Sequence, residues 1–179
     1  FGAFALVEAI GEAGAFSALR ALNLSYCPAI TALPPEMGAI ANLQALALRD
    51  CTALTCLPPE LGRCAALASL DLHGCRSLVE LPPELGQCAA LASLGVGRCG
   101  AMVAVPDASA GCASLGSIDA TYCKALRSLP ADLGRCSELH TLDCRYCKEL
   151  RELPDGLGGC AALTSLRLSD CYALTSLPA

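Results

Sequence analysis

The sequence contains no tryptophan, few aromatic residues of any kind and little charge. Aromatic residues make up 4% of the 179 residues and charged residues 16%, whereas 54% are hydrophobic. With so few large rings, the core must be filled by small and medium apolar side chains, above all Ala, Leu and Cys. The high apolar fraction excludes an intrinsically disordered chain, because disordered segments combine low hydrophobicity with high net charge.

Positive charge is also scarce, and it is spread evenly along the chain. Twelve Lys and Arg stand against 17 Asp and Glu, so the formal net charge is −5. Because phosphate binding needs clustered Lys and Arg, we do not expect nucleic acid as the main partner. No run of about 18 uninterrupted apolar residues occurs, so no membrane insertion is expected. No signal peptide is visible either.

The dominant feature is an internal repeat of 24 residues. A second apolar position follows the first after three residues and a third after two more, as in Leu19, Leu22 and Leu24. The first position recurs without insertion or deletion as Leu19, Leu43, Leu67, Leu91, Leu115, Leu139 and Leu163. One such unit cannot bury its own apolar side, so the units must stack into a solenoid.

Each unit divides into an extended part and a helical part. The Leu-x-Leu step has a period of two, which is typical of a short strand. A Leu-Pro pair follows, and Pro ends the extended segment because it fixes φ and lacks an N–H. The next residues, as in Pro83-Glu84-Leu85-Gly86, predict a single turn of α- or 3₁₀-helix with Pro near its start and Gly closing it.

The unit LxxLxLxxCxxLxxLPxELG resembles the leucine-rich repeat, and the resemblance covers residues 19–179. It implies an α/β fold: a curved solenoid with a parallel β-sheet on the concave face and short helical turns and extended segments on the convex face. The segments 22–27 and 166–171, each followed by LxxLP, look most like repeats of plant intracellular immune receptors and algal proteins. Those receptors also carry a nucleotide-binding domain, which nothing here matches.

Two parts of the chain are distinguished. Residues 19–179 form seven repeat units, the last of them truncated, so we expect the chain to belong to a longer protein or a larger complex. Residues 1–18 are either a degenerate half-unit or an N-terminal cap. Leu6, Gly14 and Phe16 fall on repeat positions, which favours the half-unit, whereas the composition of residues 4–10 favours a capping helix.

Twelve of the 14 cysteines occupy two repeat positions. Seven follow the strand and five end the helical turn. We predict buried thiols that pack between coils and form a cysteine ladder. Disulfides between neighbouring coils are the alternative, but parallel side chains disfavour the S–S torsion of about 90°. Free, buried thiols imply a reducing intracellular compartment. The cytoplasm is the simplest choice, and an organelle is the alternative. Cys144 occupies an inward strand position and Cys147 belongs to the cysteine ladder, and no second pair completes a zinc site.

The fourth unit departs from the pattern. Gly95–Gly100 matches GxGxxG but lacks the strand-to-helix setting of a dinucleotide site, so no cofactor is expected. The same unit replaces Pro-Glu-Leu-Gly by residues 106–110. Gly95 and Gly97 stand where other units carry polar side chains. They form either a notch for close approach of a partner, or part of a drifted repeat with changed local curvature.

The variable positions around each strand are predicted to project from the concave sheet. They are rich in Tyr and Arg, the residue types of interface hot spots. The predicted partner-binding residues are Tyr26, Arg49, Asp71, His73, Arg98, Asp119, Tyr122, Asp143, Arg145, Tyr146 and Arg167, with Gly95 and Gly97 as the notch.

The sequence bears on three classes of function. The composition and repeat favour a non-catalytic module that presents a rigid concave surface to a protein partner. The alternative is a structural subunit that braces a large assembly through its edges, convex side or open end. An enzyme is not expected, because no set of catalytic groups stands out. Asp71 and His73 could form a proton pair, but the sequence favours the interpretation that His73 is an ordinary surface residue.

Overall fold

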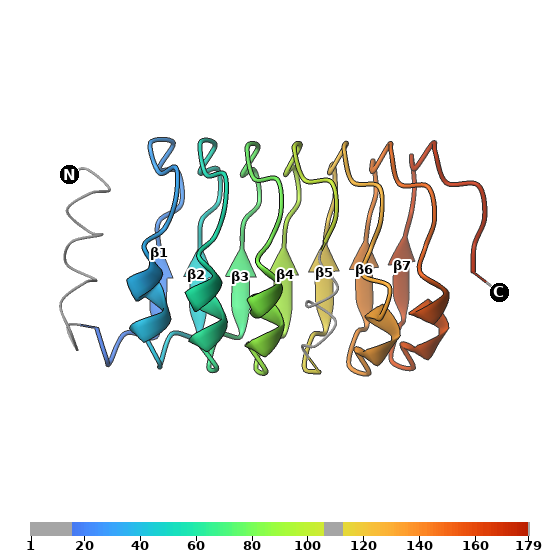
Figure 1. Cartoon of the computed structure of the whole chain (residues 1–179). Coiled ribbons are helices and arrows are strands. Elements are labelled where there is room, and N and C mark those ends of the chain that lie inside the picture. The colour runs from blue at the N-terminus through green and yellow to red at the C-terminus, as the bar shows by residue number, and fades with distance from the viewer. Residues whose placement is uncertain (1–15, 106–112, 179) are drawn as a thin grey trace.

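The computed structural model describes residues 16–105 and 113–178, which form a stack of coils with one strand each (Figure 1). The coils are numbered by their strands. The strands are β1 (Ala21–Asn23), β2 (Ala45–Ala47), β3 (Ser69–Asp71), β4 (Ser93–Gly95), β5 (Ser117–Asp119), β6 (Thr141–Asp143) and β7 (Ser165–Arg167). They make one parallel sheet in the order β1 to β7, and each pairs with the next in a 24-residue register, as in Leu22 with Leu46. The open parallel sheet of a leucine-rich-repeat solenoid is thus confirmed.

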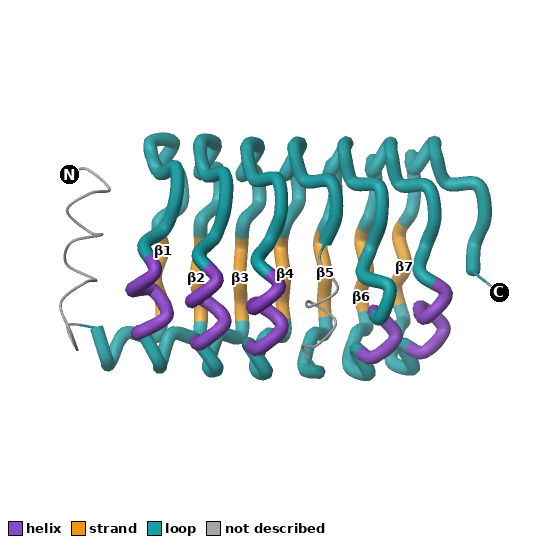
Figure 2. The backbone as a smooth tube through the Cα atoms, viewed as in Figure 1, coloured by secondary structure: helices purple, strands orange, loops and turns teal. Residues whose placement is uncertain are grey.

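Short 3₁₀-helices lie on the side of the stack opposite the sheet (Figure 2). Those within the described residues are η1 (Pro35–Ala39), η2 (Pro59–Arg63), η3 (Pro83–Gln87), η5 (Leu133–Arg135) and η6 (Asp155–Gly159). The first three begin at the predicted Pro, and the extended Pro before it is the N-cap, as Pro82 is before Pro83. In η6 the N-cap is Pro154, and in η5 it is Asp132. The departing segment 106–110 and the N-terminal positions Leu6 and Gly14 lie outside the described residues.

The core runs along the stack between the sheet and the 3₁₀-helices. The middle residue of each internal strand points into it, and Leu46, Leu94 and Leu142 are at most 1% exposed. The third apolar position, just after the strand, is equally buried in coils 2 to 6. Phe16 and the positions in and around strand β1, namely Leu19, Leu22, Leu24 and Cys27, are partly buried and pack against this core.

The glycine of the 3₁₀-helix is required by the distance between coils. A Cβ atom placed on Gly38 or Gly62 would overlap the backbone carbonyl oxygen of Glu60 or Glu84 in the following coil. Gly134 has the same relation to Gly156. The sequence interpretation assigned this glycine to closing the helical turn. Its larger role is to let neighbouring coils stack closely.

The cysteines after the strands form a ladder of thiol hydrogen bonds. From coil 2 onwards each Sγ donates to a backbone carbonyl of the preceding coil, at 3.1 Å from Cys75 to Leu48 and 3.0 Å from Cys123 to Val96. A second ladder uses the cysteines that end the 3₁₀-helices, as in Cys64 to Met37 at 3.3 Å. Burial raises the pKa of Cys75 and of Cys123 to about 12, so both thiols stay protonated and keep donating.

The thiol chemistry agrees with the cysteine prediction. The cysteines within residues 16–105 and 113–178 are free thiols, and all but Cys27, Cys56 and Cys171 are buried. Cys144, at the apolar position just after β6, and Cys147, in the ladder, are both fully buried. No group of three His, Cys, Asp or Glu suited to a metal ion occurs in the described part of the chain. Over the same residues, no helix is both long and apolar enough to cross a membrane.

Candidate functional site

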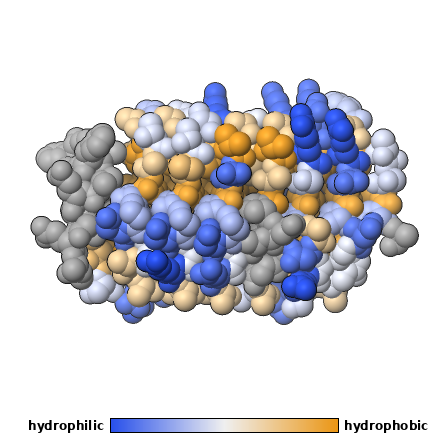
Figure 3. All heavy atoms as spheres, viewed as in Figure 1, coloured by the Kyte–Doolittle hydropathy of each residue, from blue (hydrophilic) through white to orange (hydrophobic). Residues whose placement is uncertain are grey.

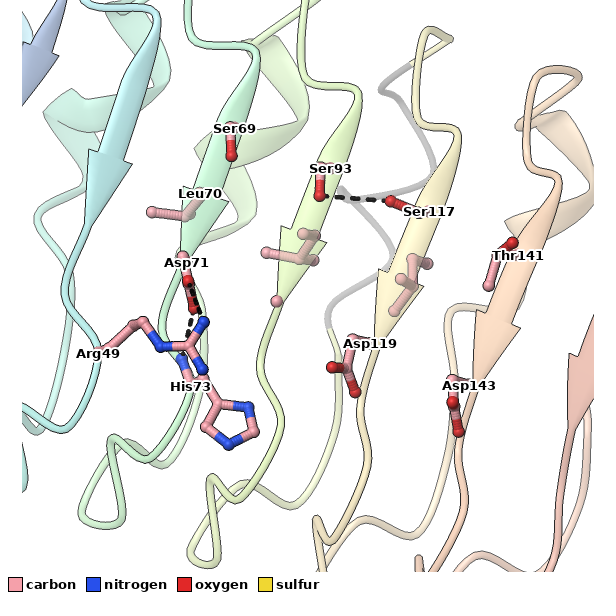
Figure 4. A pocket seen from close by; sticks show the side chains of 13 residues that line it. Arg49, Ser69, Leu70, Asp71, His73, Ser93, Ser117, Asp119, Thr141 and Asp143 are labelled. Carbon is pink, nitrogen blue, oxygen red and sulfur yellow. Dashed lines mark hydrogen bonds and ion pairs between the residues drawn. The ribbon is translucent and has the colours of Figure 1, made fainter.

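The exposed face of the sheet, formed by the outward side chains of β3 to β6, contains a polar depression (Figure 4). The first and third residues of each strand point away from the core. The depression has a volume of about 400 Å³. Its polar lining consists of Ser69, Ser93, Ser117, Thr141, Asp71, Asp119, Asp143, Arg49 and His73. Gly95 lies between Asp71 and Asp119, which are its partners on the two neighbouring strands. Small hydroxyl side chains and three carboxylates thus line it, together with Leu70, Leu94 and Ile118.

The carboxylates also hold the turns that follow the strands. Asp119 Oδ1 accepts the backbone N–H of Thr121 at 2.9 Å, and Asp71 Oδ1 accepts that of His73 at 3.1 Å. Asn23 and Asp143 bond the residue two places on in the same way. This is the local turn that Asx side chains favour. The contact between Asp71 and His73 therefore joins the carboxylate to the backbone, which is not the geometry of a proton pair.

The residue after each of these turns has a left-handed backbone. Its φ lies between 52° and 79° in all seven coils. The residues are Tyr26, Asp50, Gly74, Arg98, Tyr122, Tyr146 and Asp170. They stand beyond the strand ends, so Tyr26, Arg98, Tyr122 and Tyr146 do not lie on the sheet face as expected. We call this edge, made by the turns from the left-handed residue to the one after the ladder cysteine, the carboxyl-end rim.

Ion pairs neutralise two of the three carboxylates of the depression. Asp143 accepts two hydrogen bonds from Arg145 Nε and one at 2.8 Å from Arg145 Nη2, and Arg167 Nη1 approaches it at 3.4 Å. Burial alone would raise the pKa of Asp143, but the hydrogen bonds from Arg145 outweigh it and lower the pKa. Arg49 Nη1 pairs with Asp71 Oδ2 at 3.0 Å. No ion pair joins Asp119 to another described residue.

Aromatic stacking connects three coils along the rim. The rings of Tyr122 and Tyr146 are stacked, with centroids 4.3 Å apart and planes 9° from parallel. The guanidinium of Arg98 lies 5.5 Å from the centroid of the Tyr122 ring. Such pairs stabilise a fixed arrangement of exposed side chains. Tyr26 makes no ring contact with any described residue, so it stands apart from this group.

The two glycines of the predicted notch have different surroundings. A Cβ atom at Gly95 would lie 3.4 Å from Asp71 Oδ1, which is an ordinary contact distance. At Gly97 it would lie 2.6 Å from His73 Nδ1 and 2.9 Å from Thr121 Oγ1. The imidazole of His73 therefore fills the space over Gly97. Only Gly95 leaves an opening in the sheet face.

The predicted residues thus separate into two groups. Asp71, Asp119, Asp143 and Gly95 lie on the sheet face, with Arg49, His73, Arg145 and Arg167 around them, whereas the Tyr residues and Arg98 belong to the rim. The prediction omitted the hydroxyl row of Ser69 to Thr141 and the basic rim residues Arg76 and Lys124. Their repeat positions could have shown both: the hydroxyls begin each strand, and the basic residues directly follow the ladder cysteine.

Known structures share this architecture. The leucine-rich-repeat domain of the type III effector XopL is 28% identical, with a TM-score of 0.80, over 92% of this chain and 57% of that one. A leucine-rich-repeat protein of Leptospira interrogans is 27% identical, with a TM-score of 0.68, over 78% of this chain and 34% of that one. The chain therefore spans just over half and about a third of the length of these two.

More distant likenesses show the fold alone. The Arabidopsis receptor kinase HAESA, solved in complex with a peptide hormone and a co-receptor, is 19% identical, with a TM-score of 0.55, over 84% of this chain and 29% of that one. No protein-family model and no curated protein sequence matches the chain. The 24-residue register, the single parallel sheet and the two nearer likenesses together make this chain a leucine-rich-repeat protein.

Proposed function

We propose that the chain is a non-catalytic protein-interaction module and that the sheet face of β3 to β6 is its principal contact surface. The observation that carries the proposal is the depression of about 400 Å³ over four strands. A sheet held by buried ladders is rigid, so it offers a preorganised surface and little ordering cost on binding. The matched chains of the XopL domain, the Leptospira protein and HAESA are all longer than the part that aligns with this chain.

The lining suggests the chemistry of the bound segment. Asp119 is exposed and has its Oδ2 free of ion pairs, whereas Asp71 and Asp143 are neutralised by Arg partners. Gly95 leaves room beside Asp71 for a partner's backbone. We infer an extended segment that passes over Gly95 and places a basic side chain against Asp119, where a charge-assisted hydrogen bond would form.

The experiment is a capture of partners from native extract under reducing conditions with tagged chain. Gly95→Tyr fills the depression while its Cβ meets only ordinary contacts, so the fold should be retained. Gly158→Tyr is the matched control, because Gly158 lies in η6 on the opposite side and a Cβ there meets nothing within 4 Å. A protein that binds wild type and the control but not Gly95→Tyr supports the sheet face.

The other outcomes separate the alternatives. A partner retained by Gly95→Tyr and lost with Gly158→Tyr would place the contact on the 3₁₀ side or at the C-terminal end of the stack, because the equivalent glycines Gly38 and Gly62 face the following coil. A partner retained by both variants would favour the bracing subunit, which contacts its neighbours through its edges. Thermal unfolding of both variants checks that each is folded. Because the ladder thiols must stay protonated and reduced, we further propose a reducing compartment, and we propose that binding needs no cofactor.

A further inference from the structure

A basic hollow lies on the carboxyl-end rim between coils 3 and 5, outside the sheet face. It has a volume of about 330 Å³ and is lined by Arg76, Arg98, Gly100, Tyr122 and Lys124. Three of these five residues are cationic and none is acidic. In the view of Figure 3, hydrophilic side chains project from this edge of the stack, above a band of apolar residues.

The cations of the hollow have no acidic partner in the described part of the chain. Arg76, Arg98 and Lys124 take part in none of the four ion pairs there. The rim carboxylates Asp50 and Asp170 stand in coils 2 and 7, outside the hollow. Three neighbouring positive charges without a counter-charge repel one another, and the repulsion is notable in a chain whose net charge is −5.

The repeat explains how the hollow arises. Arg76, Gly100 and Lys124 occupy the same position of three consecutive coils, directly after the ladder cysteine. Because Gly100 has no side chain, a gap opens between the two cations, and a Cβ atom there would meet nothing within 4 Å. The floor is fixed by Arg98 and Tyr122, which both have φ near 60° and pack as a cation–π pair.

We propose that this hollow binds a carboxylate of an acidic segment in a protein partner. Guanidinium groups form paired hydrogen bonds with carboxylates, and a Lys ammonium adds a third charged donor. A nucleic acid fits less well, because its continuous phosphate charge would also run past the carboxylates of the adjacent sheet face and meet the net negative charge of the chain. The inference adds a second contact to the proposed sheet-face function and does not depend on it.

The test uses the purified chain and a fluorescein-labelled hexaglutamate peptide, with binding followed by fluorescence anisotropy at low and physiological salt. The rim variant replaces Arg76, Arg98 and Lys124 by Gln. The control variant replaces Arg20, Arg63 and Arg135 by Gln, so that the net charge changes equally. We expect the rim variant to bind at least about tenfold more weakly and the control to stay within about twofold of wild type.

Several results would overturn the proposal. Equal weakening by the two variants would mean diffuse electrostatic attraction, and absence of hexaglutamate binding to wild type would mean that the hollow takes no carboxylate. A twelve-nucleotide oligothymidylate that binds more tightly and displaces the peptide would point to phosphate recognition instead. The Gly95→Tyr variant should bind hexaglutamate like wild type, so failure of the sheet-face function and failure of the rim site give different patterns. Thermal unfolding excludes loss of fold as the cause.

Discussion

The buried ladders and the carboxyl-end rim follow opposite rules. In the ladders, the same kind of side chain returns every 24 residues, and the thiols after the strands repeat one hydrogen bond at 3.0 to 3.3 Å. On the rim, the backbone repeats while the side chain changes from coil to coil, since Tyr, Asp, Gly and Arg all occupy the left-handed position. Repetition of the backbone therefore does not require repetition of the rim residue.

The rim also retains strain that the ladders do not. A left-handed backbone costs a residue with a side chain roughly 1–2 kcal/mol relative to Gly. Only Gly74 avoids this cost, whereas the other six coils carry Tyr, Arg or Asp. Strained residues of this kind concentrate at functional positions. The contrast fits our proposal that the ladders specify the fold, whereas the rim and the sheet face are open to contact with a partner.

The largest expected effect tests the ladders through pH. The pKa of Cys75 and Cys123 is about 12 in the folded chain, against about 8.5 when the thiols are exposed on unfolding. The stabilisation is complete below about pH 8.5 and is lost as the pH rises towards 12. Each such thiol removes about 1.4 kcal/mol per pH unit in that window, so the free energy of unfolding should fall steeply above about pH 8.5. Urea midpoints at increasing pH measure this decline.

Cys123→Ala is the matched variant for the pH series. It is less stable than wild type at neutral pH, because it loses the bond to Val96 and some packing. Its free energy of unfolding should nevertheless fall less steeply between about pH 9 and 11, by about 1.4 kcal/mol per pH unit. Identical slopes for the variant and wild type would mean that the thiol ladder is not the source of the pH dependence.

The second prediction compares two glycines on the 3₁₀ side. Gly62→Ala brings a Cβ onto the carbonyl oxygen of Glu84, so the free energy of unfolding should fall by about 1–3 kcal/mol. Gly158→Ala meets open space and should raise it by about 0.5 kcal/mol, because the unfolded chain loses freedom. Chemical denaturation of both variants measures the difference. Similar values for the two would show that coil spacing is not set at this glycine.

The repeat made the interior of this protein predictable from the sequence, whereas part of the surface structure could not be predicted from it. Leu22, Leu46 and their equivalents share a side of the chain by spacing alone, so the sheet, its order and its core follow from the sequence. The left-handed rim position does not, because Tyr and Arg carry no sign of a positive φ and only Gly74 does. Gly95 and Gly97 look alike in sequence, yet the ring of His73 from the neighbouring coil fills the space over Gly97 and leaves the space over Gly95 open.

The third prediction separates the carboxylates of the sheet face. Asp143→Asn keeps the turn acceptor, as Asn23 does, but loses the charge that holds Arg145 and Arg167. Because Asp143 is buried, the free energy of unfolding at pH 7 should fall by about 1–2 kcal/mol, whereas exposed Asp119→Asn should change it by less than about 0.5 kcal/mol. The pKa of Asp143 is lowered by its Arg partners, so its contribution is present above about pH 4 and disappears as the pH falls through the folded pKa. Urea denaturation at pH 7 and pH 3 tests both statements, and equal losses for the two variants would contradict them.

The smallest effect compares two tyrosines of the rim. Tyr26 and Tyr122 have φ of 62° and 60°, but only Tyr122 is stacked on a neighbour and covered by an Arg. Tyr26→Gly relieves the backbone and should raise the free energy of unfolding by about 0.5–1 kcal/mol. Tyr122→Gly gains the same relief but loses the stack and the cation–π contact, so it should lower that energy by about 0.5–1 kcal/mol. If urea denaturation shows a rise in the free energy of unfolding for Tyr26→Gly and a fall for Tyr122→Gly, the backbone strain at Tyr122 is offset by contacts within the chain and that at Tyr26 is not. Equal gains for both would mean that neither tyrosine is retained for stability, which leaves contact with a partner as the reason for both.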